Sequence, residues 1–354
     1  MTALGDLLIR RIGQTGPITL ADYMADCLLH PTHGYYATRD PFGTAGDFTT
    51  APEISQMFGE LLGLSLAQAW LDQGSPRAFT LAELGPGRGT LMADVLRATK
   101  GLRGFHAAAH VMLVEASPIL RTLQRRTLGT YPATWADSVD DLPDAPLFLL
   151  ANEFFDALPI RQFTRHPDGW CETLVGVTDA RLTLGRSMPA RFAQLEHRLD
   201  VPFGGVVEVC AAASPIMAGI GARIAIHGGA AVIVDYGDWL SRGDTFQALR
   251  AHAYTDPLAE PGLADVTAHV DFAALAAAAA PAVSTTMVTQ GALLTRLGIV
   301  QRSDRLAASL SGAALEQHLA ATRRLTDPAE MGTLFKALGL HPPKAPPPPG
   351  FTDA

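Results

Sequence analysis

Residues 82–90 read Ala-Glu-Leu-Gly-Pro-Gly-Arg-Gly-Thr. This stretch follows an apolar run over 79–84 and opens a helix-like run over 90–98, which predicts a strand, a glycine turn and a helix. The turn glycines let the backbone approach a ligand closely and leave helix N–H groups available to it. They are Gly85, Gly87 and Gly89. A dinucleotide fingerprint needs another glycine three residues after Gly87, where this chain has Thr90.

A second apolar run, over 111–114, ends in Glu115, which lies 30 residues after Gly85. That interval fits one strand–helix–strand repeat of a parallel sheet, in which ligands bind at the carboxyl ends of the strands. A carboxylate there can accept hydrogen bonds from both hydroxyls of a ribose, although it can also be a solvated acid. The glycine spacing, with Glu83 just upstream, resembles motif I of S-adenosylmethionine (SAM) methyltransferases. We therefore predict that Glu83, the three glycines and Glu115 bind SAM.

Strand-like and helix-like segments alternate over 79–150. The alternation predicts an α/β fold with a mostly parallel sheet and helices on both faces. The resemblance to SAM methyltransferases implies that this is the Rossmann-like fold of the class I SAM-dependent methyltransferases. The expected parts are a helical N-terminal segment with a cofactor-covering loop at 1–75, a methyltransferase domain at 76–340 with antiparallel and helical insertions at about 160–228 and 238–272, and a Pro-rich disordered tail at 341–354.

A polar loop with a leading glycine precedes the apolar helix pattern of residues 54–62. It reads Gly-Asp-Phe-Thr-Thr-Ala-Pro-Glu over 46–53, and Thr50 and Glu53 have the spacing of a capping box. We expect this loop to fold over the cofactor and exclude water, although it can also be an ordinary helix entry. The residues expected to contact SAM here are Gly46, Asp47, Thr49 and Thr50.

A third buried run, over 147–151, ends in Asn152 and Glu153, and Asp156 follows three residues later. As the end of a neighbouring strand, these groups would lie beside the glycine turn. An arginine guanidinium is a poor nucleophile because its charge is delocalised. Carboxylates could grip it, localise that charge and steer one nitrogen toward a methyl group. We predict Glu153, Asp156 and Asn152 as catalytic residues; the alternative is that the acids cap a helix or pair with Arg161.

A further strand is expected to end at Trp135-Ala136, before Asp137 and Ser138. In a methyltransferase sheet this position lies by the adenine. Asp137 could accept a proton of the exocyclic amine and the Ser138 backbone could complete the contact. The alternative is a turn acid or a helix N-cap.

The composition excludes several classes of protein. The net charge is −8 and there is no long basic run, so we expect no nucleic-acid partner. The three cysteines form no C-x-x-C pair, and we expect no metal. The longest apolar run, 273–280, is too short to cross a bilayer, and the N-terminus lacks the apolar region of a signal peptide. We expect a cytoplasmic protein with no membrane span.

Two later stretches, 245–258 and 262–272, are polar and show little secondary-structure pattern. They contain too many aromatic and apolar residues for disorder, so we expect a pair of substrate-facing loops.

Taken together, these stretches resemble the MidA family, whose mitochondrial members are complex I assembly-factor arginine methyltransferases. The motifs span most of the chain. They are residues 46–56, 83–90, 114–118 and 152–159, Asp235-Tyr236-Gly237, His269-Val270-Asp271-Phe272 and Met331-Gly332-Thr333-Leu334-Phe335-Lys336.

The resemblance implies a protein substrate, with symmetric dimethylation of an arginine on a subunit of complex I (NADH:quinone oxidoreductase) during assembly. It also suggests a bacterial member, because no mitochondrial presequence is evident, and a possible homodimer. Two other functions stay open: methylation of a small molecule, since a fold does not identify its acceptor, and a non-catalytic assembly chaperone that binds SAM.

The glycine turn generates a prediction about the cofactor. Gly87→Val places a branched side chain where the ligand must approach, so the variant should lose SAM binding, and the unmodified protein should bind SAM and not NAD. Titration calorimetry with both ligands measures this. Tight NAD binding, or unchanged SAM binding by the variant, would contradict the cofactor assignment.

Overall fold

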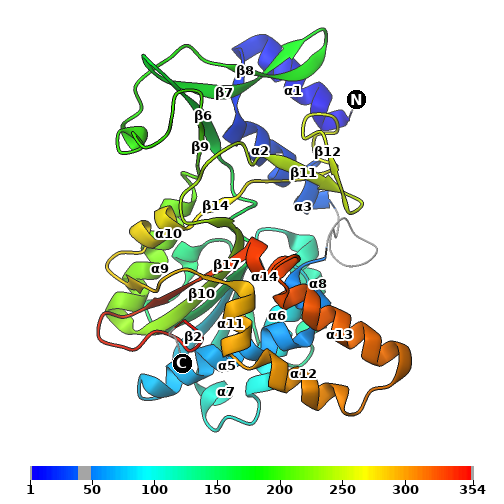
Figure 1. The fold of residues 1–354 in the computed structure, drawn as a ribbon, viewed down its shortest axis with the longest axis vertical. Coiled ribbons are helices and arrows are strands. Elements are labelled where there is room, and N and C mark those ends of the chain that lie inside the picture. Colours follow the sequence, from blue (N-terminus) through cyan, green and yellow to red (C-terminus); the bar gives the residue numbers. More distant parts are fainter. Residues whose placement is uncertain (1, 39–48, 352–354) are drawn as a thin grey trace. The chain divides into compact units, whose positions relative to one another are not determined.

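A computed structural model describes residues 2–38 and 49–351, and its fold is drawn in Figure 1. The described residues form two compact units, each built from three stretches of chain. The first unit comprises 2–38, 156–213 and 238–271, and the second comprises 49–155, 214–237 and 272–351.

The second unit is built on a mostly parallel sheet, in the order β15-β17-β10-β5-β2-β3-β4. Its parallel strands are β2 (Phe79–Leu84), β3 (Ala109–Val114), β4 (Thr134–Ala136), β5 (Leu147–Asn152) and β10 (Gly229–Asp238). The strands β15 (Val283–Ser284), β16 (Val288–Thr289) and β17 (Phe335–His341) add antiparallel pairing beside β10. Every residue of β2 and β5 is buried, as expected for strands covered on both faces. The α/β class is confirmed.

Helices complete the core of this unit (Figure 1). They are α4 (Ala51–Ile54), α5 (Gln56–Asp72), α6 (Thr90–Thr99), α7 (Phe105–Ala108), α8 (Pro118–Leu128), α9 (Ala213–His227), α10 (Phe272–Ala278), α11 (Gln290–Arg296), α12 (Ile299–Ala307), α13 (Gly312–Thr326) and α14 (Met331–Leu334). Helices α5 and α6 can pack closely because Gly63 has no side chain. A Cβ at this position would lie only 2.9 Å from the Val95 Cα. None of the helices in the described ranges has the length and apolarity that crossing a membrane requires.

The predicted capping box at the start of α5 is wrong. Thr50 precedes the single turn α4 and makes no side-chain cap hydrogen bond. Helix α5 starts instead after Ser55, whose hydroxyl accepts the Met57 N–H. The Glu53 carboxylate does not cap Thr50, because it accepts a hydrogen bond from the Thr90 hydroxyl instead.

An ion network around the buried Glu60 attaches α12 to α5 and α6. Glu60 on α5 is 4% exposed and accepts hydrogen bonds from Arg97 and Arg302. Burial alone would raise the pKa of Glu60, but the hydrogen bonds from Arg302 and Arg97 outweigh burial and lower that pKa. The C-terminal helices are thereby tied to the helix that follows the glycine turn.

The first unit combines helices with two small antiparallel sheets. Its helices are α1 (Ala3–Thr15), α2 (Leu20–Leu29) and α3 (Tyr35–Thr38). One sheet has the order β1-β7-β6-β9, with β8 beside β7, and the other has the order β12-β11-β13. The strands are β1 (Ile18–Thr19), β6 (Arg161–His166), β7 (Gly169–Thr178), β8 (Arg181–Arg186), β9 (Val206–Val209), β11 (Gln247–Arg250), β12 (Ala253–Thr255) and β13 (Asp265–Thr267).

Part of this unit differs from expectation. The stretches 245–258 and 262–272 were expected as loops, yet β11 pairs with both β12 and β13 across them. These strands are three or four residues long, too short to show an alternating pattern of their own, so their pairing is a tertiary effect.

The expected boundaries also differ from the compact units. The N-terminal segment 1–75 is divided, with 2–38 in the first unit and residues from 49 onward in the second. The first insertion ends at 213 rather than 228, because α9 belongs to the unit that contains the parallel sheet.

The Pro-rich tail is packed as far as Phe351, so the expectation of disorder is wrong for the described part. Phe351 is 7% exposed and belongs to the main apolar core. The Pro349 carbonyl accepts a hydrogen bond from the Ser65 hydroxyl at 2.8 Å. Proline lacks an N–H to satisfy, so this segment packs through side chains and carbonyl oxygens without joining a helix or sheet.

This packing predicts that Phe351→Ala destabilises the protein by about 3 kcal/mol, the usual cost of truncating a buried aromatic side chain. Leu319→Ala on α13 removes a half-exposed side chain and should cost less than about 0.5 kcal/mol. Urea unfolding of both variants measures the difference. Equal stability of the two variants would contradict the packing of the tail.

Candidate active site

Most of the predicted site residues in the second unit lie at one edge of its sheet. Strands β2, β3, β4, β5 and β10 run parallel, so their carboxyl ends meet there. The groups that follow these strands are the glycine turn, Glu115, Asp137 with Ser138, and Glu153. Neighbouring strands lie about 4.8 Å apart, so groups on adjacent strand ends can contact a single ligand.

The glycine turn has the backbone that its sequence predicts. Gly85, Gly87 and Gly89 all have positive φ, at 56°, 53° and 83°. A Cβ on Gly85 would lie 2.8 Å from the Phe154 ring. Gly89 is the N-cap of α6 and provides no side chain to cap that helix. Substitution in this turn is therefore opposed by backbone strain and, at Gly85, also by a steric clash.

Glu83 is a buried acid at the end of β2. It is 3% exposed, and its Oε2 has no hydrogen-bond partner among the described residues. Burial raises the pKa of Glu83 from 4.5 to about 8; a hydrogen bond from the Met92 backbone opposes the shift, and the charges of Glu115 and Asp94 add to it. A buried oxygen of this kind is suited to a cationic ligand group, which would offset the desolvation of its charge.

Glu115 is held by donors from its own loop and from α8. Its Oε1 accepts the Ser117 N–H at 2.8 Å, and its Oε2 accepts the Gln124 amide at 3.0 Å. Burial raises the pKa of Glu115, and the hydrogen bonds from Ser117 and Gln124 counteract that shift. Gln124 also donates to the Gly87 carbonyl at 2.8 Å and accepts from the Trp135 indole at 2.7 Å. Gln124 thus connects the glycine turn, the acid and the strand β4.

The residues predicted beside an adenine make local contacts. Asp137 has a side chain that is 85% exposed and pairs with Arg121. The Asp137 and Ser138 N–H groups both donate to the Asp141 carboxylate, at 3.1 and 2.9 Å. Ser138 begins the 3-10 turn η1 (Val139–Asp141) with a capping box. These contacts match the capping alternative for Ser138, and an adenine contact at Asp137 stays a prediction.

Glu153 has a strained backbone at the end of β5. Its φ is +51°, a left-handed value that is uncommon for residues other than glycine and tends to occur at functional sites. Its Oε1 accepts hydrogen bonds from the Ala51 N–H at 3.2 Å and from the Asn152 amide at 2.9 Å. The Asn152 Oδ1 is buried without a hydrogen-bond partner in the described part of the chain.

Asp235 on β10 holds the turn that contains Glu153. It is fully buried, and its Oδ2 accepts the Phe154 and Phe155 N–H groups at 3.2 and 3.0 Å. Its Oδ1 accepts the Tyr236 N–H at 2.9 Å. The Phe154 ring, which this turn carries, is the group that lies against Gly85.

Asp156 belongs to the first unit, so a role for it beside Glu153 stays a prediction. It is 6% exposed, and its carbonyl accepts the Ala268 N–H at 3.0 Å. Arg161, the alternative partner for the predicted acids, forms a bidentate ion pair with Glu172.

The predicted covering loop is only partly described. Gly46 and Asp47 lie outside the described residues. Thr49 is partly buried and Thr50, the N-cap of α4, is buried, and any contact of these two with a cofactor stays a prediction.

Three residues of this edge were not predicted to belong to the site: Glu53, Gln124 and Asp235. Glu53 was interpreted as a helix cap, and Gln124 carries no sequence signal apart from being polar on the buried face of α8. Asp235 appears in the sequence analysis only within the Asp235-Tyr236-Gly237 motif, although it follows a buried apolar run, which is the same signal that identified Glu115.

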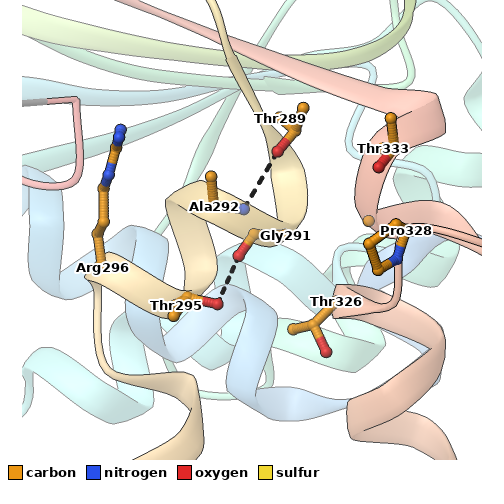
Figure 2. A pocket seen from close by; sticks show the side chains of 9 residues that line it. Thr289, Gly291, Ala292, Thr295, Arg296, Thr326, Pro328 and Thr333 are labelled. Atoms are coloured by element: carbon orange, nitrogen blue, oxygen red, sulfur yellow. Dashed lines mark hydrogen bonds between the residues drawn. The ribbon is translucent and has the colours of Figure 1, made fainter.

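A separate hollow of about 320 Å³ lies among the C-terminal helices. Its lining comes from β16, α11 and the segment from the end of α13 into α14, and none of these residues was predicted to hold the cofactor. Figure 2 shows that the Thr289 hydroxyl accepts a hydrogen bond from the Ala292 N–H and that the Thr295 hydroxyl donates one to the Gly291 carbonyl. Both hydroxyls therefore have partners within α11 and its N-cap. In residues 2–38 and 49–351, no group of three or more His, Cys, Asp or Glu side chains is arranged to hold a metal ion.

Glu83 generates a prediction about stability and pH. Between pH 4.5 and 8 the folded protein keeps a proton on Glu83 that the unfolded chain has released, so the free energy of unfolding falls as pH rises through this window. Glu83→Gln removes that dependence and should be more stable than the unmodified protein at pH 8, by ~1 kcal/mol or more. The difference should vanish near pH 4.

Urea unfolding of the cofactor-free protein between pH 4 and pH 8.5 tests this. Glu316→Gln, an exposed acid on α13, serves as the control. Parallel stability curves for Glu83→Gln and the unmodified protein would contradict the protonated state of Glu83.

Comparison with known proteins identifies the family of this chain. Residues 61–289 match a family described as "Putative S-adenosyl-L-methionine-dependent methyltransferase". The chain is 38% identical to "Protein arginine methyltransferase NDUFAF7, mitochondrial" of Danio rerio, over 93% of this chain and 84% of that protein. It is 37% identical to the Homo sapiens protein of the same name, over 95% of this chain and 82% of that protein.

A solved structure is also similar throughout. It is a "likely methyl transferase" from Burkholderia thailandensis bound to S-adenosyl-homocysteine, with a TM-score of 0.83 and 30% identity, covering 99% of this chain and 93% of that one. The MidA-type resemblance, the methyltransferase fold and SAM as the cofactor are confirmed. This chain belongs to the family of S-adenosyl-L-methionine-dependent methyltransferases.

Proposed function

We propose that the protein transfers methyl groups from SAM to an arginine side chain of another protein. The observation that carries this proposal is the pair of acceptors at the end of β5, the Glu153 carboxylate and the Asn152 Oδ1, next to the strand that leads into the glycine turn. The names of relatives that are 37–38% identical over most of the chain support arginine as the acceptor.

The residues at the sheet edge fit the cofactor. The ammonium group of SAM suits the unpartnered Oε2 of Glu83, and the carboxylate of SAM suits the first N–H groups of α6, which Gly89 leaves without a side-chain cap. Glu115 would accept from the ribose hydroxyls, with Asp137 at the adenine. When bound, SAM supplies an electrophilic methyl group.

Glu153 would then act on the acceptor. Its carboxylate accepts hydrogen bonds from the guanidinium and draws positive charge toward the bonded nitrogens, so that another nitrogen gains lone-pair character. The Asn152 Oδ1 adds a second acceptor. A carboxylate at this point can also take the proton that the nitrogen loses as the N–C bond forms. The left-handed backbone of Glu153 fixes where this carboxylate is presented.

The finer identity of the substrate belongs to the proposal too. We propose symmetric dimethylation of a complex I subunit during assembly, in the cytoplasm, on the strength of the MidA resemblance. Mass spectrometry of complex I subunits, with and without this protein, tests the proposal by searching for one arginine that carries two methyl groups. Methylation of a small molecule instead, or SAM binding without any transfer, would overturn it.

The role of Glu153 predicts the outcome of a near-isosteric substitution. In Glu153→Gln the amide oxygen can still accept from Ala51 and Asn152, so the fold and the SAM affinity should survive. The charge that localises the guanidinium is lost, and methyl transfer should fall by roughly 10²-fold or more. Asp156→Asn should show the same loss more weakly.

The measurement is methyl transfer to an arginine-containing subunit, alongside thermal stability and SAM calorimetry. Unfolding of Glu153→Gln would make the residue structural. Unchanged transfer would mean that the acceptor is held elsewhere.

A further inference from the structure

The single-turn helix α4 is hydrogen-bonded to both halves of the proposed active site. On one side, Glu53 contacts the residues that flank Gly89. Its Oε1 accepts the Thr90 hydroxyl at 2.5 Å, and its Oε2 lies 3.9 Å from the Arg88 guanidinium. Hydrogen bonds from a hydroxyl to a carboxylate are among the stronger ones in proteins.

On its other side, α4 contacts the proposed catalytic acid. The Ala51 N–H donates to the Glu153 Oε1 at 3.2 Å, and the Asn152 amide donates to the same oxygen at 2.9 Å. One oxygen of Glu153 is therefore oriented jointly by its neighbour on β5 and by the first residue of α4.

The residues of α4 that make these two contacts, Ala51 and Glu53, lie in the same helical turn. Ala51 and Glu53 are two residues apart in one turn, and the Glu53 N–H donates to the Thr50 carbonyl at 2.9 Å. A shift of the glycine turn that moves Thr90 must therefore move Glu53, and with it the Ala51 N–H.

Packing also holds α4 in the unit. Ala51 is fully buried and Pro52 is buried beside it, whereas the Glu53 side chain is 20% exposed. The Glu53 side chain takes less part in this packing than Ala51 and Pro52, so its hydrogen bond to Thr90 is available for a role in orientation.

We propose that Glu53 is a positioning residue that couples occupancy of the glycine turn to the orientation of Glu153. This inference rests on the proposed function for the role of Glu153. Cofactor bound at the turn fixes Thr90, Glu53 transmits that restraint to α4, and the Ala51 N–H then holds the Glu153 carboxylate in one orientation.

Amide hydrogen exchange tests the coupling, with S-adenosylhomocysteine as the probe at saturating concentration. In the unmodified protein the probe should slow exchange in the peptide 49–55 by roughly tenfold, the scale of one hydrogen bond to a charged group. Glu53→Ala and Thr90→Val should bind the probe yet show less than about twofold slowing in that peptide. Thr90→Ser restores the hydroxyl and should restore the slowing, and Glu316→Ala on α13 is the surface control.

A second readout is turnover at saturating SAM. Glu53→Ala and Thr90→Val should lose about tenfold in turnover with little change in thermal stability, and Thr90→Ser should recover it. If Glu53→Ala fails to fold, the near-isosteric Thr90→Val still decides the question.

Equal slowing of peptide 49–55 in all variants would overturn the coupling. Weaker SAM binding with normal turnover at saturation would overturn it too, because Glu53 would then serve only the cofactor turn. Exchange needs no acceptor, so a protein that failed to methylate arginine would disprove the proposed function while the coupling would still be measured.

Discussion

The arrangement of the sheet edge depends on the buried carboxylate of Asp235. A carboxyl group with no solvent exposure is costly unless its oxygens are hydrogen-bonded, and here the donors include the backbone N–H groups of Phe154, Phe155 and Tyr236. Satisfying this carboxylate fixes the turn after β5. The same turn holds Glu153 at its left-handed φ and places the Phe154 ring against Gly85. Through Asp235, the strand β10 therefore fixes both the position of Glu153 and the packing of the Phe154 ring against the glycine turn.

The sequence predicts this site where the signal is local. Continuous apolar runs that end in Gly85, Glu115 or Asn152 identify buried parallel strands, and parallel strands bring their ends to one edge. Residues whose partners are distant leave no such pattern. Glu53 bonds to a hydroxyl 37 residues later, and Gln124 meets the Gly87 carbonyl at the same separation. Capping-box spacing at Thr50 and Glu53 was a genuine local signal that this long-range contact overrode.

The fold, like the site, can be predicted from the sequence where the signal is local. The parallel strands have long apolar runs, whereas β11 to β13 are short segments that exist only because they pair. In the tail, proline content predicts the absence of helix and strand but not the absence of packing. Phe351 finds a place in the core that only the folded unit provides. The compact units could not be delimited from composition, since each gathers three distant stretches of chain.

The position of β17 has a consequence for biosynthesis. Strand β10 pairs with β5 on one side and with β17 on the other, and about a hundred residues separate β10 from β17. During synthesis β10 therefore keeps much of one edge open until residues 335–341 have left the ribosome. An open edge is a template for pairing with other chains. Ribosomes that stall or terminate before residue 335 would release chains with this edge exposed, and such fragments should be aggregation-prone clients of chaperones rather than partly active enzymes.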